Sequence, residues 1–186
     1  EDNSAFDDGL QLEGRNPVLE ALNHDKPIDK LFVKKGEIEG TLKVIVAKAR
    51  EKGILVQEVD REKMAAMSRS NNNQGVIAFC PAHEYCEVSD ILEIARKKGE
   101  DPFIIICDEI TDPHNLGAII RTADACGAHG VIIPKRRAVG LSAIVSKTSA
   151  GAVEFVPVAR VTNLARTVDE LKKANIWIAC ADMSGR

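Results

Sequence analysis

The sequence predicts an α/β protein made of two consecutive units, the second built around a parallel, doubly wound sheet. Short apolar runs alternate with segments of helical length along most of the chain, and this alternation is typical of α/β folds. In the second half the apolar runs read as buried strands separated by helices, which indicates a parallel sheet covered on both faces. Residues 81–89, between the two halves, are interpreted as a linker.

Local signals mark the ends of the elements in the first unit. Asn16 is predicted to cap the first helix, because Pro17 behind it stands where the first turn tolerates proline. Gly53 is expected to end the second helix, and Asp60 to cap a short third one. The elements expected here are a helix from residue 17, helices at 42–52 and 61–67, and strands at 31–33, 54–59 and 75–79.

The second unit repeats the alternation of strand and helix. A helix at 90–98, which Gly99 ends, leads into it. Apolar strands are predicted at 103–107, 130–133, 154–158 and 176–181, with helices between them at about 115–127, 141–148 and 163–174. The expected domain limits are a disordered tail at 1–9, a first domain at 10–82, a linker and helix at 83–100 and a second domain at 101–186.

The composition is that of an ordinary soluble globular protein, with 45% hydrophobic and 28% charged residues. No apolar run approaches the roughly 18–20 residues that span a membrane, and the start EDNSAFDDG is not a signal peptide. The five cysteines show no ligand spacing, so we expect reduced thiols in a cytoplasmic protein and no metal site. The net charge of −3 leaves nucleic-acid binding to a local basic surface.

The loop after strand 103–107 carries the residues that most suggest a site. Ligands of open parallel sheets bind at the carboxyl ends of the strands, and this loop leaves such an end. Asn115 is placed as a helix N-cap, beside N–H groups that favour an anion. Gly117 and Arg121 share a helical face, where glycine would leave room for a ligand beside the guanidinium. Simple capping by Asn115 and a surface ion pair of Arg121 with Asp124 are the alternatives.

Several motifs together resemble a known family. The stretch 112–131 reads D-P-x-N-x-G-x-x-x-R-T-A-x-x-x-G-x-x-x-V, and 146–154 reads SKTSAGAVE. Gly14-Arg15-Asn16-Pro17-Val18 and Asn73-Gln74-Gly75-Val76 belong to the first unit. These motifs are similar to those of the SpoU (TrmH-type) RNA 2′-O-ribose methyltransferases of the SPOUT superfamily. Within that family the chain most resembles the bacterial 23S rRNA guanosine 2′-O-methyltransferases, although Asn73 stands where they usually have histidine.

The resemblance implies methylation of a ribose 2′-OH in RNA, most closely 23S rRNA, with S-adenosylmethionine as cofactor. It implies a ribosomal-protein-like small domain and a SPOUT-type catalytic domain that forms a homodimer. The knot segment and most of the cofactor pocket would follow Arg186, so we expect this chain to be an incomplete catalytic domain. Arg121 would hold a phosphate and stabilise charge on the 2′-oxygen, and Asn115 would orient Arg121 or the ribose. Ala181 and Gly185 would touch the edge of the cofactor.

The candidate RNA contacts form two sets. The basic run at 135–137 follows a strand end on the same side as Asn115, where it would meet phosphates unless it is only a solvated turn. The polar loop at 71–74 would read unpaired bases. The residues predicted to bind RNA are Arg15, Asn73, Gln74, Gly75, Lys135, Arg136, Arg137 and Lys147, with Ser149 beside the last.

Two other functions stay open at this point. An RNA-binding module without catalysis is consistent with the small domain alone. A small-molecule nucleotide-binding protein is the third interpretation, but the sequence lacks the glycine pattern of a dinucleotide or nucleoside triphosphate loop.

Overall fold

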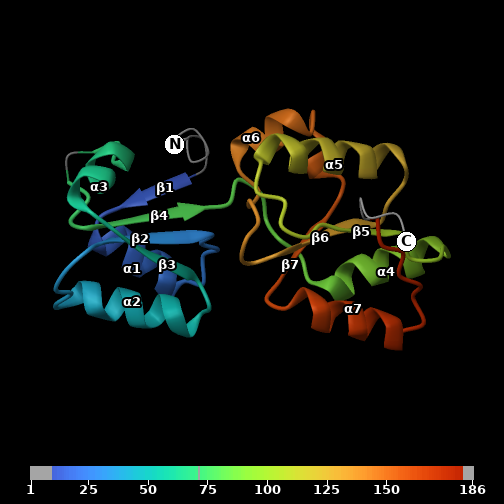
Figure 1. Cartoon of the computed structure of the whole chain (residues 1–186), viewed down its shortest axis with the longest axis horizontal. Helices are drawn as coiled ribbons and strands as arrows, with labels where there is room; N and C mark the ends of the chain where they lie inside the picture. Colours follow the sequence, from blue (N-terminus) through green and yellow to red (C-terminus); the bar gives the residue numbers. More distant parts are fainter. Residues whose placement is uncertain (1–9, 71, 182–186) are drawn as a thin grey trace.

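The computed structural model describes residues 10–70 and 72–181, and it shows two α/β units joined by a short extended segment (Figure 1). The N-terminal unit, residues 10–80, contains a four-stranded mixed sheet of order β1-β4-β2-β3. The C-terminal unit, residues 88–181, contains the three-stranded parallel sheet β5-β6-β7. The predicted division into two α/β units and the parallel sheet of the second unit are confirmed. The predicted tail at residues 1–9 lies outside the described residues.

The N-terminal unit has helices on both faces of its sheet. Its strands are β1 (Leu10–Glu13), β2 (Lys30–Lys34), β3 (Leu55–Val59) and β4 (Val76–Cys80). Its helices are α1 (Arg15–Asn23), α2 (Thr41–Glu51) and α3 (Arg61–Met67). Alternate residues of a strand face opposite sides of a sheet. Leu31 and Val33 therefore enter the core that α1 and α2 cover, while Phe32 packs with Met64 of α3.

Two local predictions in this unit need correction. Asn16 does not cap α1; the N-cap is Gly14, whose positive φ of 94° suits glycine. The backbone N–H of Arg15 is bound instead by the side chain of Gln74, at 2.9 Å. The first strand, β1, was not predicted, because four residues of mixed polarity carry little strand signal before their pairing with β4 is known.

The C-terminal unit is a parallel sheet between two layers of helices. Its strands are β5 (Ile104–Ile106), β6 (Gly130–Pro134) and β7 (Val158–Val161). Its helices are α4 (Val88–Lys98), α5 (Pro113–Ala125), α6 (Ala143–Thr148) and α7 (Leu164–Lys173), with a 3-10 turn η2 (Ala152–Glu154). Val131 and Ile133 face α5 and α6, whereas Ile132 faces α4 and α7. The sheet is buried on both faces, as its apolar strands predicted.

Two predicted strands of this unit are wrong. The run at 154–158 is a strand only from Val158 onward, because positive φ values at Ala150 and Gly151 turn the chain into η2 first. The segment 176–181 forms no strand, and Trp177 is 98% exposed. An apolar run becomes a strand only when it pairs with a neighbouring strand, and within the described residues this segment pairs with none.

The connecting segment is fixed to the C-terminal unit. The N–H of Ala82 donates to the carbonyl of Leu141 at 2.7 Å, and the N–H of Cys86 donates to the carbonyl of Val158 at 2.9 Å. The segment thus runs along β7 and brings the N-terminal unit to the carboxyl edge of the parallel sheet (Figure 1).

Among the described residues, no helix has the length and apolar character needed to cross a membrane.

Candidate functional site

The helix α5 begins with a different cap from the one predicted. Its N-cap is Asp112, whose side chain accepts a hydrogen bond from the N–H of His114 at 2.8 Å, and Pro113 follows as the first helical residue. Asn115 stands in the first turn with an exposed side chain. Asp and Asn compete for the same capping position, and the residue directly before the proline takes it. Asn115 is therefore released from capping and faces solvent.

Gly117 serves the packing of two helices and does not open a space for a ligand. A Cβ atom at this position would lie 1.9 Å from Oγ1 of Thr148 in α6 and 3.0 Å from the N–H nitrogen of Ser149. Glycine is required because α5 and α6 touch here, in the core under both helices. The prediction that Gly117 leaves room beside Arg121 is wrong.

Arg121 lies one turn further along α5, on its exposed surface. Within the described part of the chain it forms no ion pair with Asp124, the alternative partner considered from the sequence. Asn115 is six residues away, which is about 9 Å along a helix axis and on another side of the helix. The two are not hydrogen-bonded to each other in the described structure, so a direct orientation of Arg121 by Asn115 is not what this arrangement provides.

Most of the other predicted RNA contacts fall into two groups, one in each unit. The first group lies at the start of α1, where the guanidinium Nε of Arg15 donates to the carbonyl of Gln74 at 3.3 Å. Asn73 closes the turn at Gly75 by accepting the glycine N–H at 2.9 Å. The second group, Lys135 to Arg137, follows β6 of the C-terminal unit. Lys135 and Arg137 line a pocket together with Cys80 at the end of β4, so the length of β4 separates them from Gly75 at its start. That length is roughly 15 Å.

Glu13 holds the first group in place, and no sequence motif pointed to it. Its carboxylate accepts hydrogen bonds from the hydroxyl of Ser68 at 2.7 Å and from the backbone N–H groups of Arg69 and Ser70, at 2.5 and 3.1 Å. Burial opposes the charge of Glu13, but hydrogen bonds from Ser70 and Ser68 outweigh it and lower the pKa of the carboxyl. The ionised Glu13 thus fixes the chain at Ser68, Arg69 and Ser70.

A hollow of about 310 Å³ lies between the two units, at the carboxyl edge of the parallel sheet. We call it the interunit hollow. The loops after β5 and β6 supply one side of it, and the starts of β2 and β3 and the end of β4 supply the other. Its lining residues are Asp29, Lys30, Leu55, Phe79, Cys80, Thr111, Lys135, Arg137, Ala138, Val139, Gly140, Ser142 and Arg160. Two of the three predicted basic residues, Lys135 and Arg137, therefore reach this hollow.

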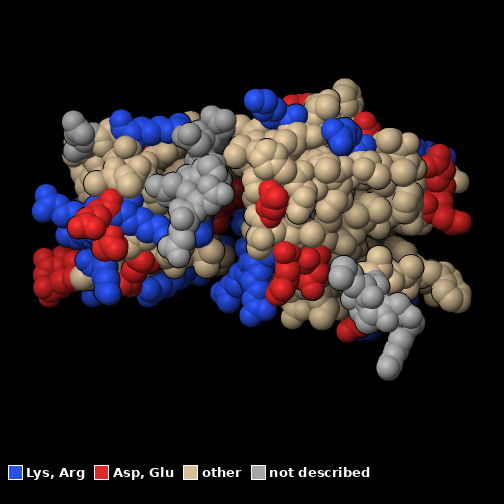
Figure 2. Space-filling model, turned by 45° about the horizontal axis from the view of Figure 1, so that its top comes forward, with Lys and Arg blue, Asp and Glu red and all other residues tan. Residues whose placement is uncertain are grey.

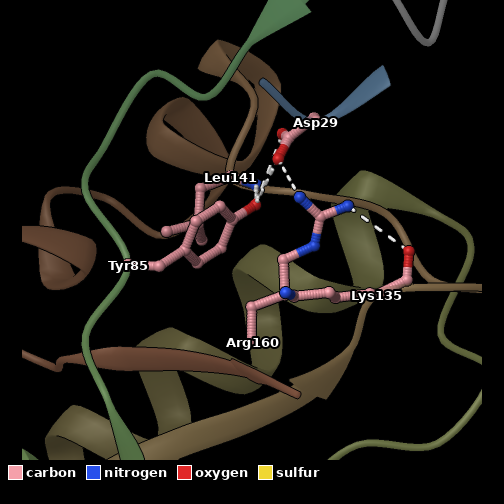
Figure 3. A network of polar contacts seen from close by, with 5 residues as sticks. All are labelled: Asp29, Tyr85, Lys135, Leu141 and Arg160. Carbon is pink, nitrogen blue, oxygen red and sulfur yellow. Dashed lines mark hydrogen bonds and ion pairs between the residues drawn. The ribbon is translucent and has the colours of Figure 1, made fainter. Parts of the chain in front are cut away.

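A buried ion pair ties the two units together beside the hollow (Figure 3). Arg160 of β7 pairs through Nη1 with Asp29, and its Nη2 donates to the carbonyl of Lys135 at 3.4 Å. Asp29 and Arg160 are only 18% and 13% exposed. The hydroxyl of Tyr85 donates to Asp29 at 3.1 Å and accepts the N–H of Leu141 at 3.0 Å. The ring of Tyr85 also lies 5.2 Å from the guanidinium carbon of Arg160.

Burial dominates the ionisation of this network. It raises the pKa of Asp29, although the charge of Arg160 and the hydroxyl of Tyr85 act in the opposite direction. Burial likewise raises the pKa of Tyr85, so that its hydroxyl keeps the proton it donates. None of these three residues was predicted. An arginine within the apolar run Val158-Ala159-Arg160-Val161 was the available signal, because a charged residue in a buried strand needs a partner.

The remaining predicted site residues differ in their accessibility. Lys147 is exposed at the end of α6 and can meet RNA, but Ser149 is fully buried, with its hydroxyl donating to the carbonyl of Ser146. The predicted RNA contact of Ser149 is therefore wrong. Ala181 is exposed, and Gly185 lies outside the described residues. No group of three or more potential metal ligands occurs among the described residues.

Charge is unevenly distributed over the surface. Figure 2 shows Lys and Arg side chains over the N-terminal unit and at its junction with the C-terminal unit, with Asp and Glu side chains among them and beside the junction. The adjoining face of the C-terminal unit carries few charges in this view (Figure 2). Lys135 and Arg137 thus form a local group of positive charge at the interunit hollow, in a protein with a net charge of −3.

Comparison with known proteins places both units in described families. Residues 102–186 match the SpoU rRNA Methylase family, and residues 11–86 match the family described as RNA 2′-O ribose methyltransferase substrate binding. A putative TrmH family tRNA/rRNA methyltransferase of Bacillus subtilis is 48% identical over 173 residues, which cover 93% of this chain and 69% of the relative. A Staphylococcus aureus protein of the same description is 43% identical, over 90% of this chain and 67% of the relative.

Solved structures with similar chains include an AdoMet-bound rRNA methyltransferase from Sinorhizobium meliloti. It is 28% identical, with a TM-score of 0.42, and the match covers 89% of this chain. The chain spans 59% of the length of that structure.

Proposed function

Because the chain belongs to the SpoU (TrmH) family of RNA methyltransferases, we propose that it methylates the 2′-oxygen of a ribose in ribosomal RNA, with S-adenosylmethionine as methyl donor. The resemblance seen in the sequence is thereby confirmed at the level of the family. The choice of the 2′-oxygen is supported by the match of the N-terminal unit to a substrate-binding family of 2′-O ribose methyltransferases. The choice of rRNA is supported by the match of the C-terminal unit to the SpoU rRNA methylases. We propose 23S rRNA first because the sequence motifs most resemble those of the 23S rRNA enzymes.

The observation that carries this proposal is the position of Arg121. It extends into solvent from a helix whose other side is packed against the sheet and α6, and within the described residues it forms no ion pair with the neighbouring Asp124. An arginine with this freedom can bind a phosphate of an incoming RNA by paired hydrogen bonds. Catalysis would use the same positive charge to stabilise the negative charge that develops on the ribose oxygen.

The described residues do not by themselves fit S-adenosylmethionine. A ligand site buries roughly 70–90% of its ligand, whereas Ala181 and the segment before it are exposed, with Trp177 98% exposed. The cofactor supplies an electrophilic methyl group when it is bound. The described residues of this chain act on the RNA side of the reaction.

On that side, Arg121 would align the ribose through its neighbouring phosphate. A ribose hydroxyl is a weak nucleophile, so correct alignment and charge stabilisation are what a protein can contribute. Arginine stays protonated and is therefore unsuited to remove the proton, which the phosphate itself can accept. Asn115 would contact the ribose independently of Arg121, given the distance between them along α5.

We further propose that the protein acts in the cytoplasm and as a homodimer through the C-terminal unit. Large apolar side chains that are exposed in this unit support the second point, because an interface would cover them. They include Phe103 at 45% and Phe155 at 78% exposure.

Methyl transfer to purified RNA tests the proposed function. The complete enzyme, meaning a protein that contains this chain together with a full cofactor pocket, is incubated with S-adenosylmethionine carrying a labelled methyl group. It should label unmodified rRNA and leave unmodified tRNA at background, whereas residues 1–186 alone should transfer no methyl group. Transfer to tRNA alone would contradict rRNA as the substrate. RNA binding without transfer to either would favour the second candidate function, an RNA-binding module without catalysis. The hydrogen bonds between Arg15 and Gln74, two predicted RNA contacts, support this second candidate.

A further inference from the structure

We propose that the interunit hollow holds one unpaired nucleotide of the substrate RNA, with its base between the apolar walls and its phosphate at Lys135 and Arg137. This inference rests on the proposed function, since it takes RNA as the substrate. The nucleotide in the hollow is a different one from the nucleotide whose ribose faces Arg121. The hollow would therefore select RNA that presents an unpaired base.

The place of the hollow in the fold is the first support. Parallel α/β sheets bind ligands in the crevice outside the carboxyl ends of their strands. Thr111 follows β5, Lys135 follows β6, and Arg160 lies near the end of β7, so all three strands direct residues to this crevice. Its volume of about 310 Å³ falls within the range of small-molecule sites.

The lining has the chemistry of a nucleotide site. Leu55 and Phe79 from the N-terminal unit oppose Ala138 and Val139 from the C-terminal unit, and these apolar walls suit the faces of a base. Among the described lining residues, four basic side chains stand against a single carboxylate, Asp29, which is already paired with Arg160. The basic residues are Lys30, Lys135, Arg137 and Arg160.

One of these cations has an exchangeable partner. Arg137 pairs with Glu109 at 2.9 Å, but the two side chains are 80% and 59% exposed. Exposed ion pairs contribute little stability. A phosphate can therefore replace Glu109 at Arg137 with little loss, and the charges at the mouth of the hollow favour such an anion.

The walls of the hollow are preformed, because the ion pair of Asp29 and Arg160 fixes the two units on either side of it. Gly140 allows this close approach: a Cβ atom there would lie 2.3 Å from Oδ2 of Asp29 and 2.7 Å from the hydroxyl of Tyr85. The N–H of Val139 also donates to the carbonyl of Ile110 at 2.9 Å, which joins the two loops of the C-terminal side. A preformed pocket binds with little loss of conformational entropy.

A matched pair of substitutions tests the proposal by RNA binding. Leu55 and Val44 are both exposed apolar residues of the N-terminal unit, at 39% and 46%, but only Leu55 lines the hollow. The probes are a fluorescent hairpin RNA with a randomised loop and a fully paired duplex of equal length. The parent should prefer the hairpin. Leu55→Asp should lose at least about tenfold in hairpin affinity, whereas Val44→Asp should bind like the parent.

A second variant covers the case in which Leu55→Asp does not fold. Ala138→Trp fills the hollow from the C-terminal unit and should also lose the preference for the hairpin, while keeping the salt-dependent binding of the duplex. The proposal is overturned if the parent binds hairpin and duplex equally. It is equally overturned if the folded variants bind the hairpin as tightly as Val44→Asp.

Two further measurements distinguish this RNA site from a site for a free nucleotide and from a failure of the proposed function. Adenosine and guanosine monophosphates are titrated against the parent and Leu55→Asp. Binding that only the parent shows, together with unchanged hairpin affinity in the variant, would assign the hollow to a free nucleotide and refute the RNA site. Preference for the hairpin, together with no methyl transfer by the complete enzyme, would refute the proposed function and leave the site standing.

Discussion

In the complete enzyme, Arg121→Ala should lower the turnover of methyl transfer by at least about 10²-fold, which is typical of removing one positioned group that stabilises charge in a transition state. The same variant should keep its melting temperature within a few degrees of the parent. The reason is that Arg121 lies off the buried side of α5 and has no described ion pair to lose with Asp124. Turnover is measured with a labelled methyl donor at saturating RNA, and stability by circular dichroism.

The control for this prediction is Arg166→Ala. Arg166 is 79% exposed on α7, on the opposite face of the sheet, so its removal changes the net charge equally without touching α5. Turnover near the parental value in Arg121→Ala would show that the role assigned to this arginine is wrong. A fall of the melting temperature by ten degrees or more would mean that Arg121 acts mainly in folding.

Arg160→Met should destabilise the protein by about 3 kcal/mol or more, because it leaves the carboxylate of Asp29 buried beside an apolar side chain. Methionine keeps most of the volume of arginine, so the loss reports the unpaired charge and not a cavity. Since the pair joins the two units, the variant should also unfold over a broader urea range, with the units no longer coupled.

Two further variants show whether the loss of stability in Arg160→Met comes from the unpaired charge. The single variant leaves the buried carboxylate of Asp29 without its ion-pair partner. The double variant Arg160→Met, Asp29→Asn also removes that negative charge, and should recover more than half of the lost stability. Arg96→Met breaks a comparable pair with Glu93 that is exposed at 74% and 41%, and should unfold like the parent. Equal stability of Arg160→Met and the parent would show that the ion pair does not hold the units together.

The parts of the fold that could be predicted from the sequence were those with short-range causes. Asp60 caps α3 by accepting the N–H of Lys63, and Gly99 ends α4 in the left-handed conformation. Both depend on neighbours within a few residues. The strand predicted at 176–181 was wrong for the same reason. Its apolar composition is a local signal, but strand formation needs a partner strand, which the described chain does not offer.

The site was predicted less completely, because distant contacts decide its geometry. Gly117 shares a helix face with Arg121, and a helical wheel could not show that Thr148 of α6 covers the glycine. The pair of Asp29 and Arg160 joins residues 131 positions apart. Arg121, Lys135 and Arg137 were found from motifs and charge, whereas the hollow that gathers two of them required the fold.

The position of the transferred methyl group decides whether the protein is a ribose methyltransferase. RNA labelled by the protein and S-adenosylmethionine is digested with alkali, which cleaves a phosphodiester only where the adjacent 2′-oxygen is free to attack it. Methylation of a ribose 2′-oxygen therefore leaves the label in dinucleotides that resist alkali, and this is the result we expect. Label recovered in mononucleotides would place the methyl group on a base and contradict the proposed function.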